Sequence, residues 1–271
     1  MNQTTEFITT KEYRRFVEFC NACKKENYIG LCYGPAGVGK SIAAYQFARW
    51  HEVKRELELK SEHAMGYTWP SIKMDDLDTI IYLPHVSNSP SAIHSSIRKI
   101  AFDFQILVEL SIFKDKEVPW AERLKERVKL LIIDEADRLQ PKSLEQIRDI
   151  YDRQQIAVIL IGMPGIEKRL IRFPQFYSRI GFSHMYKPLS QEEVAFIIQN
   201  NLQHLNISVD TKDFSDHEAI ATFTRITQGN FRLINRLLKQ TIRVMEVNQL
   251  SSITKEVVEA ARECLVIGNV Y

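Results

Sequence analysis

The clearest pattern along the chain is a set of short apolar runs separated by longer amphipathic stretches. A run that is apolar at nearly every position is typical of a strand buried on both faces of a sheet. Four such runs predict strands at 28–33, 79–84, 129–134 and 156–162, and a fifth strand is predicted at 185–189. Because the runs alternate with helical patterns, we expect an α/β fold with a parallel sheet and helices on both faces.

The stretches between the runs carry apolar residues at helical spacing. This spacing predicts helices at 9–26, 41–50, 90–112, 117–129 and 142–153. Residues 51–78 are mixed and charged and contain Gly66 and Pro70, so they are predicted to form an insertion.

Beyond residue 190 the strand pattern stops and only helical spacing remains. Ser190 and Glu193 stand three apart, as in a capping box that begins a helix. Helices are predicted near 190–203, 214–227, 230–247 and 254–265. We therefore expect two domains, an α/β domain at 1–189 that includes the N-terminal helix and a small helical lid domain at 190–271.

The turn after the first predicted strand carries the most specific motif. Residues 34–41 read Gly-Pro-Ala-Gly-Val-Gly-Lys-Ser and match the phosphate-loop pattern G-x-x-x-x-G-K-[ST]. A strand, a glycine-rich turn and a helix N-terminus direct backbone N–H groups at phosphates, and the helix dipole favours negative charge there. We expect Lys40 to neutralise β/γ-phosphate charge and the Ser41 hydroxyl to bind Mg²⁺. The predicted ATP-binding residues of this segment are Gly34, Pro35, Ala36, Gly37, Val38, Gly39, Lys40, Ser41 and Ile42.

Two acids end the predicted strand at 129–134. Asp134 follows the apolar run and is predicted to hold the Mg²⁺ shell, so ATP and Mg²⁺ are the expected cofactors. Glu135 is predicted to be the general base that orients the attacking water. An alternative is that both acids cap the following helix.

Composition limits the remaining choices. The 271 residues are 45% hydrophobic and 26% charged with a net charge of +2, so nucleic-acid binding requires a local basic patch. No segment has the length of a membrane helix and the first residues do not resemble a signal peptide, so we expect a cytoplasmic protein with no membrane partner. Cys20 and Cys23 form a lone C-x-x-C, which favours packing over a metal site.

The phosphate loop, the acidic strand and the C-terminal helices together resemble the AAA+ ATPases over nearly the whole chain. In that superfamily one arginine acts on the nucleotide of a neighbouring subunit, and another in the lid contacts bound nucleotide. Phe176-Tyr-Ser-Arg-Ile180 resembles the segment of the first, which makes Arg179 the candidate. Gly229-Asn-Phe-Arg232 resembles the lid motif, which makes Arg232 the second, with Arg236 as the fallback.

The chain departs from the superfamily at the end of the fourth predicted strand. A polar residue usually positions the attacking water there, whereas this strand ends Ile161-Gly-Met163. The departure predicts slow hydrolysis or a different positioning group.

A narrower resemblance is to the transposition regulators of the TnsC, TniB and MuB group. It rests on Leu131-Ile-Ile-Asp-Glu-Ala-Asp-Arg-Leu139, Pro141, Ile147–Ile150 and Ala157–Gly162. The resemblance implies a protein that oligomerises as filaments or rings on duplex DNA without sequence preference, recruits a DDE-type transposase, and disassembles on ATP hydrolysis. Since the chain lacks an N-terminal helix-turn-helix domain like that of MuB, we expect a separate target-selection protein.

The same resemblance places DNA on loops after the second strand and its helix. Backbone contacts of this kind fix position without reading sequence. The alternative for any one of these residues is a solvated charged face. The candidates are Ser87, Ser89, Arg98, Lys99, Lys114 and Lys116.

Three other functions share this motif set. A secretion or pilus ATPase usually carries a membrane segment or a peptidoglycan-binding domain. A replication initiator or helicase loader generally adds a winged-helix domain after the lid. A nucleotide switch without turnover would fit Met163.

Overall fold

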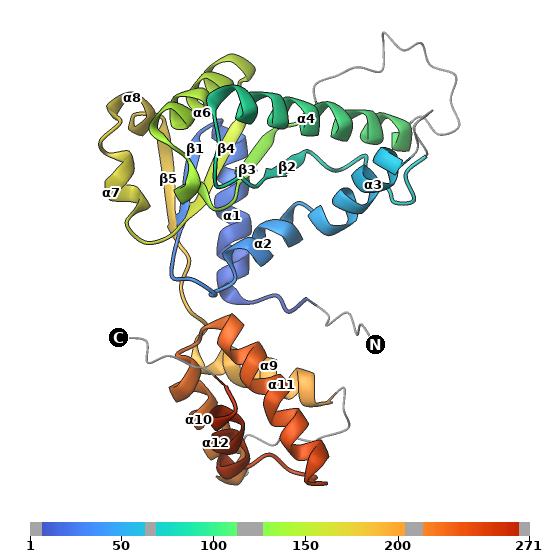
Figure 1. Ribbon diagram of the computed structural model, residues 1–271, viewed down its shortest axis with the longest axis vertical. Helices are drawn as coiled ribbons and strands as arrows, with labels where there is room; N and C mark the ends of the chain where they lie inside the picture. Colours follow the sequence, from blue (N-terminus) through green and yellow to red (C-terminus); the bar gives the residue numbers. More distant parts are fainter. Residues whose placement is uncertain (1–6, 63–68, 113–126, 204–213, 266–271) are drawn as a thin grey trace. The chain divides into compact units, whose positions relative to one another are not determined.

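The computed structural model describes residues 7–62, 69–112, 127–203 and 214–265 (Figure 1). These residues divide into two compact units. The sheet unit comprises Tyr13–Gly34 and Lys40–Met185. The helical unit comprises Pro35–Gly39 together with residues 7–12 and 186–265. The predicted domains 1–189 and 190–271 stay a prediction.

A five-stranded parallel sheet forms the centre of the sheet unit, in the order β2-β3-β4-β1-β5. Its strands β1, β3 and β4 lie between neighbours and are almost wholly buried, which explains their continuous apolar sequences. Parallel pairing brings the carboxyl ends of the strands to one edge, where loops meet ligands in such sheets. The bounds are β1 Ile29–Tyr33, β2 Thr79–Tyr82, β3 Leu130–Ile133, β4 Ala157–Gly162 and β5 Ile180–Met185.

The fifth strand does not lie at 185–189 as predicted but at Ile180–Met185. It pairs only with β1, at the edge of the sheet, and most of its residues are exposed. An edge strand needs no continuous apolar run, so its sequence gave no strand signal. The predicted run begins at the last residue of β5, and the chain from Tyr186 onward belongs to the helical unit.

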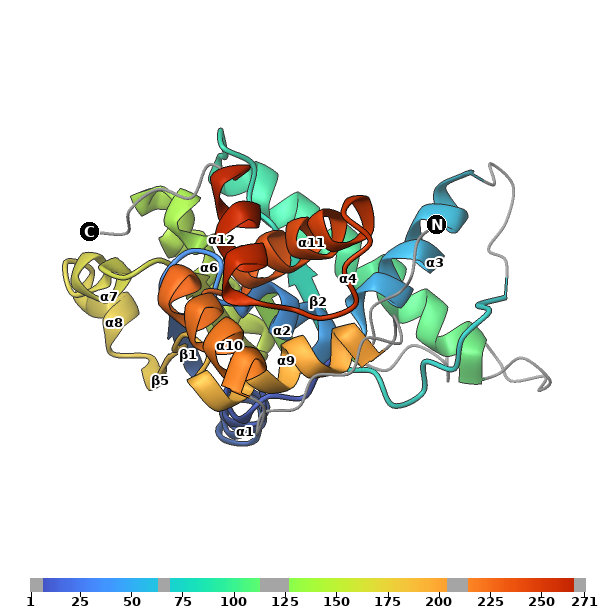
Figure 2. The ribbon, with the colours of Figure 1, turned by 90° about the horizontal axis from the view of Figure 1, so that it is seen from below.

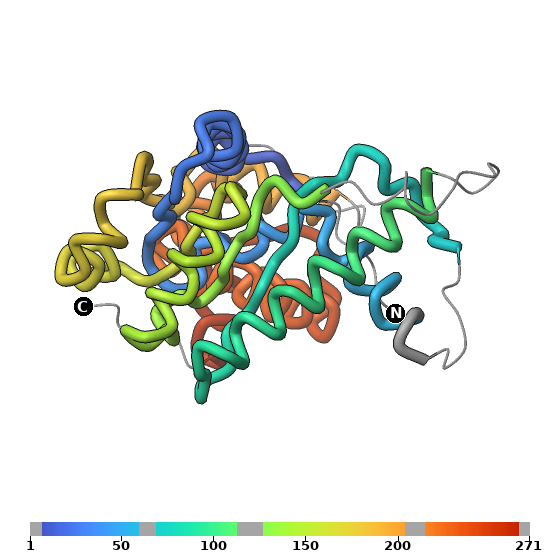
Figure 3. The backbone as a smooth tube through the Cα atoms, turned by 90° about the horizontal axis from the view of Figure 1, so that it is seen from above, coloured from blue at the N-terminus to red at the C-terminus, as the bar shows by residue number. Residues whose placement is uncertain are grey.

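Helices cover both faces of the sheet. Figures 1 and 3 show α1 (Lys11–Glu26) on one face and α4 (Pro90–Ile112) with α6 (Pro141–Gln154) on the other. The phosphate loop leads into α2 (Lys40–Phe47). Shorter segments complete the unit: η1 Ala136–Arg138, α7 Ile166–Leu170 and α8 Pro174–Tyr177.

Two predicted segments, 51–78 and 117–129, differ from the structure where it describes them. The predicted insertion at 51–78 begins instead as a helix, α3 (Trp50–Glu62), which buries Trp50, Val53 and Glu56 along one face. Most of its charged residues, including Lys54, Arg55 and Glu58, lie on its solvent side. The predicted helix at 117–129 lies outside the described residues except for 127–129, which are not helical.

The helical unit packs amphipathic helices around its own core (Figure 2). Its helices are α9 Gln191–Gln203, α10 Phe214–Thr227, α11 Phe231–Val247 and α12 Lys255–Glu263. The predicted capping box is present, because the Ser190 N–H donates to Glu193 Oε2 at 3.0 Å and the Glu193 N–H donates to Ser190 Oγ at 3.3 Å. Within the described ranges, no helix is long and apolar enough to cross a membrane.

Candidate functional site

The phosphate loop connects β1 to α2 and has the backbone that its glycines allow. Gly37 and Gly39 have φ of +80° and +112°, a region that side-chain-bearing residues rarely adopt. Lys40 opens α2 and is only 9% exposed. Its Nζ donates to the Gly34 carbonyl oxygen at 2.5 Å, so the ammonium group is held over the start of the loop. This position suits the predicted contact of Lys40 with phosphate.

Asp134 lies at the carboxyl end of β3 and is 5% exposed. Burial raises the pKa of its carboxyl group, and a hydrogen bond with the Ser41 side chain opposes that rise. Its Oδ1 also accepts the Glu135 N–H at 2.9 Å. The structure therefore brings together Ser41 and Asp134, the two oxygen ligands predicted for Mg²⁺.

These two oxygens fit a magnesium ion that is bound mainly through a nucleotide. Mg²⁺ usually takes one or two carboxylates plus phosphate oxygens and waters. The described residues contain no cluster of three or more His, Cys, Asp or Glu side chains that could hold a metal ion alone. When bound, ATP would supply the phosphoanhydride bond that is broken, and Mg²⁺ would neutralise charge on the phosphate oxygens.

Glu135 differs sharply from its neighbour Asp134. Its backbone is left-handed, with φ 52° and ψ 45°, and its side chain is 49% exposed. The carboxylate forms an ion pair with Arg138 on the following η1 turn. Arg138 is fixed in turn by donating from Nη1 to the Pro84 carbonyl oxygen at 3.0 Å. The predicted base thus lies in solvent beside β3, with its orientation set by Arg138.

The sequence analysis did not assign a role to Asp137. Its Oδ2 accepts the Met163 N–H at 2.7 Å, which places a carboxylate at the end of β4. Gly162 makes room for it, because a Cβ there would lie 2.9 Å from Asp137 Oδ2. The Met163 side chain offers no polar group at this strand end, but the Asp137 carboxylate of η1 lies there instead. The second aspartate in Asp134-Glu-Ala-Asp137 is the signal that could have identified it.

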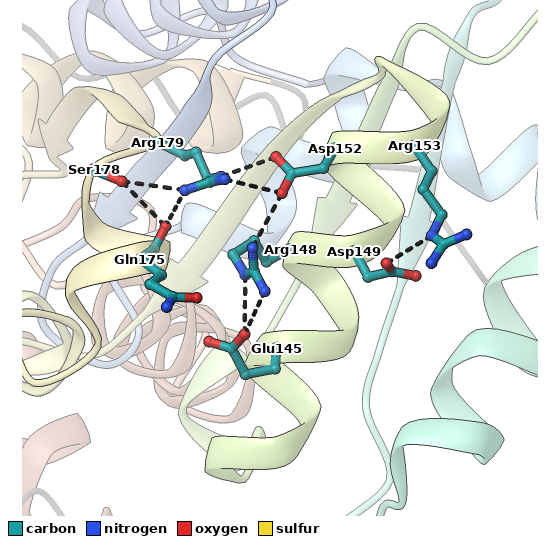
Figure 4. Close-up of polar contacts among 8 residues, drawn as sticks. All are labelled: Glu145, Arg148, Asp149, Asp152, Arg153, Gln175, Ser178 and Arg179. Atoms are coloured by element: carbon teal, nitrogen blue, oxygen red, sulfur yellow. Dashed lines mark hydrogen bonds and ion pairs between the residues drawn. The ribbon is translucent and has the colours of Figure 1, made fainter.

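Arg179 follows α8 and precedes β5. Figure 4 shows its guanidinium group against Asp152 of α6, with Nε to Oδ1 at 2.9 Å and Nη2 to Oδ2 at 3.1 Å. Hydrogen bonding from Arg179 lowers the pKa of Asp152 and raises that of Arg179 itself. The two side chains remain 31% and 34% exposed. Arg179 is therefore at the surface of the sheet unit.

In the helical unit the lid motif contacts the phosphate loop through one backbone and one side-chain N–H group. The Arg232 N–H donates to the Gly37 carbonyl oxygen at 2.9 Å, and Asn230 Nδ2 donates to the Ala36 carbonyl oxygen at 2.7 Å. Asn230 also caps α11 by accepting the Leu233 N–H. Asn230 was not among the predicted site residues, although its position after Gly229 is typical of a helix cap. The predicted contact of Arg232 with nucleotide stays a prediction.

The predicted DNA contacts are partly described. Ser87 is exposed in the loop after β2, and Arg98 and Lys99 are exposed on α4, where they line a shallow surface pocket with His94 and Phe102. Ser89 is also exposed, and its Oγ accepts the Ala92 N–H at 3.3 Å at the start of α4, so its predicted contact with phosphate stays a prediction. Lys114 and Lys116 lie outside the described residues.

The two cysteines of the C-x-x-C pair are buried in α1 as free thiols. Burial raises the pKa of Cys23 to about 12 and that of Cys20 well above its usual value. Both thiols are therefore protonated at neutral pH, which suits packing.

Comparison with known proteins adds a family profile and two relatives. A profile described as an AAA domain matches residues 23–170. A "Potential ATP-binding protein" of Staphylococcus aureus is 40% identical over 274 residues, covering 99% of each chain. The "Mu-like prophage FluMu DNA transposition protein B" of Haemophilus influenzae is 24% identical over 168 residues, which cover 60% of this chain and 48% of that protein.

Solved structures with this fold include two kinds of DNA-related protein. The RuvB Holliday junction branch migration motor of Thermotoga maritima superposes with a TM-score of 0.61 at 17% identity, over 97% of this chain and 72% of that one. The ORC1 protein of Aeropyrum pernix in complex with DNA gives a TM-score of 0.57 at 16% identity, over 93% of this chain and 64% of that one. At these identities the likeness shows the fold alone.

Proposed function

The chain belongs to the AAA domain family, and from that premise we propose that it is an ATP-dependent DNA-binding regulator of transposition. The observation that carries the proposal is the similarity to a DNA transposition protein B, combined with a phosphate loop whose Ser41 is hydrogen-bonded to Asp134. The family in general hydrolyses nucleotide. The finer proposal is that ATP binding drives assembly on target duplex DNA and that hydrolysis reverses it.

Within one subunit, the buried residues hold the nucleotide and its metal ion. Lys40 contributes positive charge beside the loop, and Ser41 with Asp134 contributes the metal-binding oxygens. Glu135, exposed beside β3, accepts a proton from the attacking water. Arg232 is a further proposed nucleotide contact.

A second subunit completes the reaction through Arg179. A guanidinium group that stabilises charge on the transferred phosphoryl group is worth several orders of magnitude in rate. The surface position of Arg179 supports action on a neighbour's ATP. The protein would then be a homo-oligomer, a filament or a ring, in its active state.

Duplex DNA is proposed to lie against the exposed loop after β2 and the basic side of α4. Arg98 and Lys99 supply charge and Ser87 supplies a hydroxyl group. Because these groups suit phosphates and not base edges, binding should be independent of sequence and weakened by salt. A DDE-type transposase and a separate target-selection protein are the further proposed partners.

The proposal is tested by fluorescence anisotropy of a labelled random-sequence duplex. Binding is expected with ATP or a slowly hydrolysed analogue, and is expected to be lost with ADP or after Lys40→Ala. Replacing both Arg98 and Lys99 by Ala should reduce the salt slope by about 1 for each phosphate contact removed. Lys142→Ala, at an exposed lysine of α6, is the matched control and should bind as wild type.

Two results would count against the proposal. Anisotropy that is the same with ATP, ADP and no nucleotide would separate DNA binding from the ATPase. Absence of DNA binding by a protein that hydrolyses ATP would favour an ATPase that remodels other proteins.

A further inference from the structure

Nearly the whole hydrogen-bonding capacity of the Arg179 guanidinium group is used inside its own subunit (Figure 4). Asp152 accepts from Nε and Nη2, while the Gln175 carbonyl oxygen at 2.5 Å and Ser178 Oγ at 3.2 Å both accept from Nη1. An arginine carries five N–H groups. Among the described residues these bonds occupy four of the five, and one N–H on Nη2 remains. The guanidinium group is therefore held at all three nitrogens and presents this one N–H.

Asp152 is itself held in place by a chain of alternating charges on α6. Its Oδ2 also accepts from Arg148 Nη1 at 3.3 Å, and Arg148 donates from Nε and Nη2 to Glu145 Oε2 at 2.9 and 2.8 Å. Glu145, Arg148 and Asp152 stand at i, i+3 and i+7, one face of a helix. We call these three residues and Arg179 the arginine cluster.

Both ends of the arrangement are tied to the sheet. The Arg179 carbonyl oxygen accepts the Ile29 N–H at 3.1 Å, at the start of β1. The Tyr151 hydroxyl, next to Asp152, donates to the Asn27 carbonyl oxygen at 2.7 Å. The backbone of Arg179 and the helix that carries Asp152 are thus anchored to the same strand end, so their spacing is fixed.

Isolated surface ion pairs add little to stability, except where geometry is bidentate or charges form a network. Asp152 and Arg179 meet both exceptions. An arginine fixed before it meets a phosphate loses less rotamer freedom on binding and reaches the transition state with no reorganisation. From this geometry we propose that Asp152 is the positioning residue for Arg179. It orients the guanidinium group so that the remaining Nη2 N–H faces a neighbouring subunit's nucleotide. The inference rests on the proposed trans role of Arg179.

The same helix offers a matched control. Asp149 Oδ1 accepts from Arg153 Nε at 2.7 Å, again an exposed Asp–Arg pair, but both partners lie on α6 (Figure 4). Asp149→Asn therefore removes an equal charge and a similar ion pair without touching Arg179.

The experiment mixes two kinds of full-length subunit and measures ATP hydrolysis. The acceptor carries Arg179→Ala and lacks the arginine, whereas the donor carries Glu135→Gln and supplies Arg179 without turnover of its own. The donor is expected to restore hydrolysis by the acceptor. Adding Asp152→Asn to the donor should lower the restored rate by about 10-fold, because a misplaced group of this kind loses one to two orders of magnitude.

Three further mixtures separate positioning from structure. Asp152→Asn in the acceptor, and Asp149→Asn in the donor, should each change the restored rate by less than about 2-fold, as for an ordinary exposed pair. Asp152→Glu in the donor keeps the charge and should recover part of the rate. Thermal unfolding of each variant confirms that it is folded before mixing.

The outcomes are distinct. An Asp152→Asn donor as active as its parent, or more active, overturns the inference and leaves the trans role of Arg179 standing. An equal loss with Asp152→Asn in donor and acceptor assigns Asp152 a structural role and also overturns it. If the parent donor restores nothing, the proposed trans role itself is wrong, and this inference falls with it.

Discussion

Two regions of the sheet unit handle charge in opposite ways. The strand-tip cluster (Gly34, Lys40, Ser41 and Asp134) contains two buried charged side chains, Lys40 and Asp134, which are hydrogen-bonded by backbone and hydroxyl groups. The arginine cluster is partly exposed, and most of its hydrogen bonds are side-chain ion pairs. The two charged side chains of the first region are shielded from solvent. The side chains of the second region are held in place by one another but remain accessible to solvent.

The difference indicates which partner each region serves. Buried charges need a charged partner or a metal ion, so they are suited to binding a small anion and its metal ion within one subunit. Exposed charges in a bidentate network are suited to a second macromolecule that arrives from outside. The contrast supports the proposal that the strand-tip cluster binds ATP and that the arginine cluster activates hydrolysis of a neighbouring subunit's ATP.

Removing the buried cation should produce the largest effect. Lys40→Ala is expected to weaken ATP binding by about 100-fold or more, because charged hydrogen bonds contribute about 1.5–3 kcal/mol each and Lys40 also neutralises phosphate charge. Fluorescence titration with a labelled ATP measures it. Lys142→Ala is the surface control, and equal affinity for the two variants would contradict the assignment.

A substitution at the exposed acid Glu135 should affect hydrolysis and leave ATP binding unchanged. Glu135→Gln is expected to lower the hydrolysis rate about 100-fold or more, since a general base contributes about 10²–10⁴. ATP affinity should stay near wild type, in contrast to Lys40→Ala. Steady-state hydrolysis together with the binding titration separates the two effects, and a rate near wild type would exclude Glu135 as the base.

The buried charge of Asp134 is expected to lower the free energy of unfolding at neutral pH. Because burial raises its pKa in the folded protein, the folded state binds a proton more readily than the unfolded state does. Stability from this group therefore falls as pH rises from the unfolded value, about 3.9, through the raised folded value. Asp134→Asn without nucleotide should be more stable than wild type at neutral pH, and the gain should vanish towards that lower value.

Denaturant unfolding across this pH range makes the measurement. A gain that stays constant with pH would show that the amide acts through packing and not through charge. A loss of stability at neutral pH would contradict the raised pKa.

The smallest expected effect is at Asp137. Asp137→Ala removes the acceptor of the Met163 N–H and should lower the free energy of unfolding by about 1 kcal/mol. The midpoint of denaturant unfolding should fall with an unchanged slope. Asp149→Ala, which removes an exposed pair, is the control with a smaller change, and an equal shift for both would contradict the role of Asp137.

Local sequence predicted those parts of the fold whose physical cause is local. The runs that became β1, β3 and β4 are buried on both faces, and α4 at Pro90–Ile112 has the predicted bounds. The edge strand β5 escaped prediction because its burial depends on one neighbour only. The helix α3 was missed because charges on its solvent face masked the buried side.

The site follows the same rule. Lys40, Ser41 and Asp134 were predicted because motif spacing places them at strand ends. Asp137 and Asp152 were not, because their partners Met163 and Arg179 are 26 and 27 residues away in sequence. Ser89 was predicted as a DNA contact, and its cap on α4 was not predicted.

The most direct test of the account is negative-stain electron microscopy of the protein with random-sequence duplex DNA. Samples with ATP, a slowly hydrolysed analogue, ADP and Lys40→Ala are compared at one protein concentration. The account predicts filaments or rings on DNA with ATP or the analogue, and dispersed particles with ADP or the variant. Particles that ignore both DNA and nucleotide would contradict it.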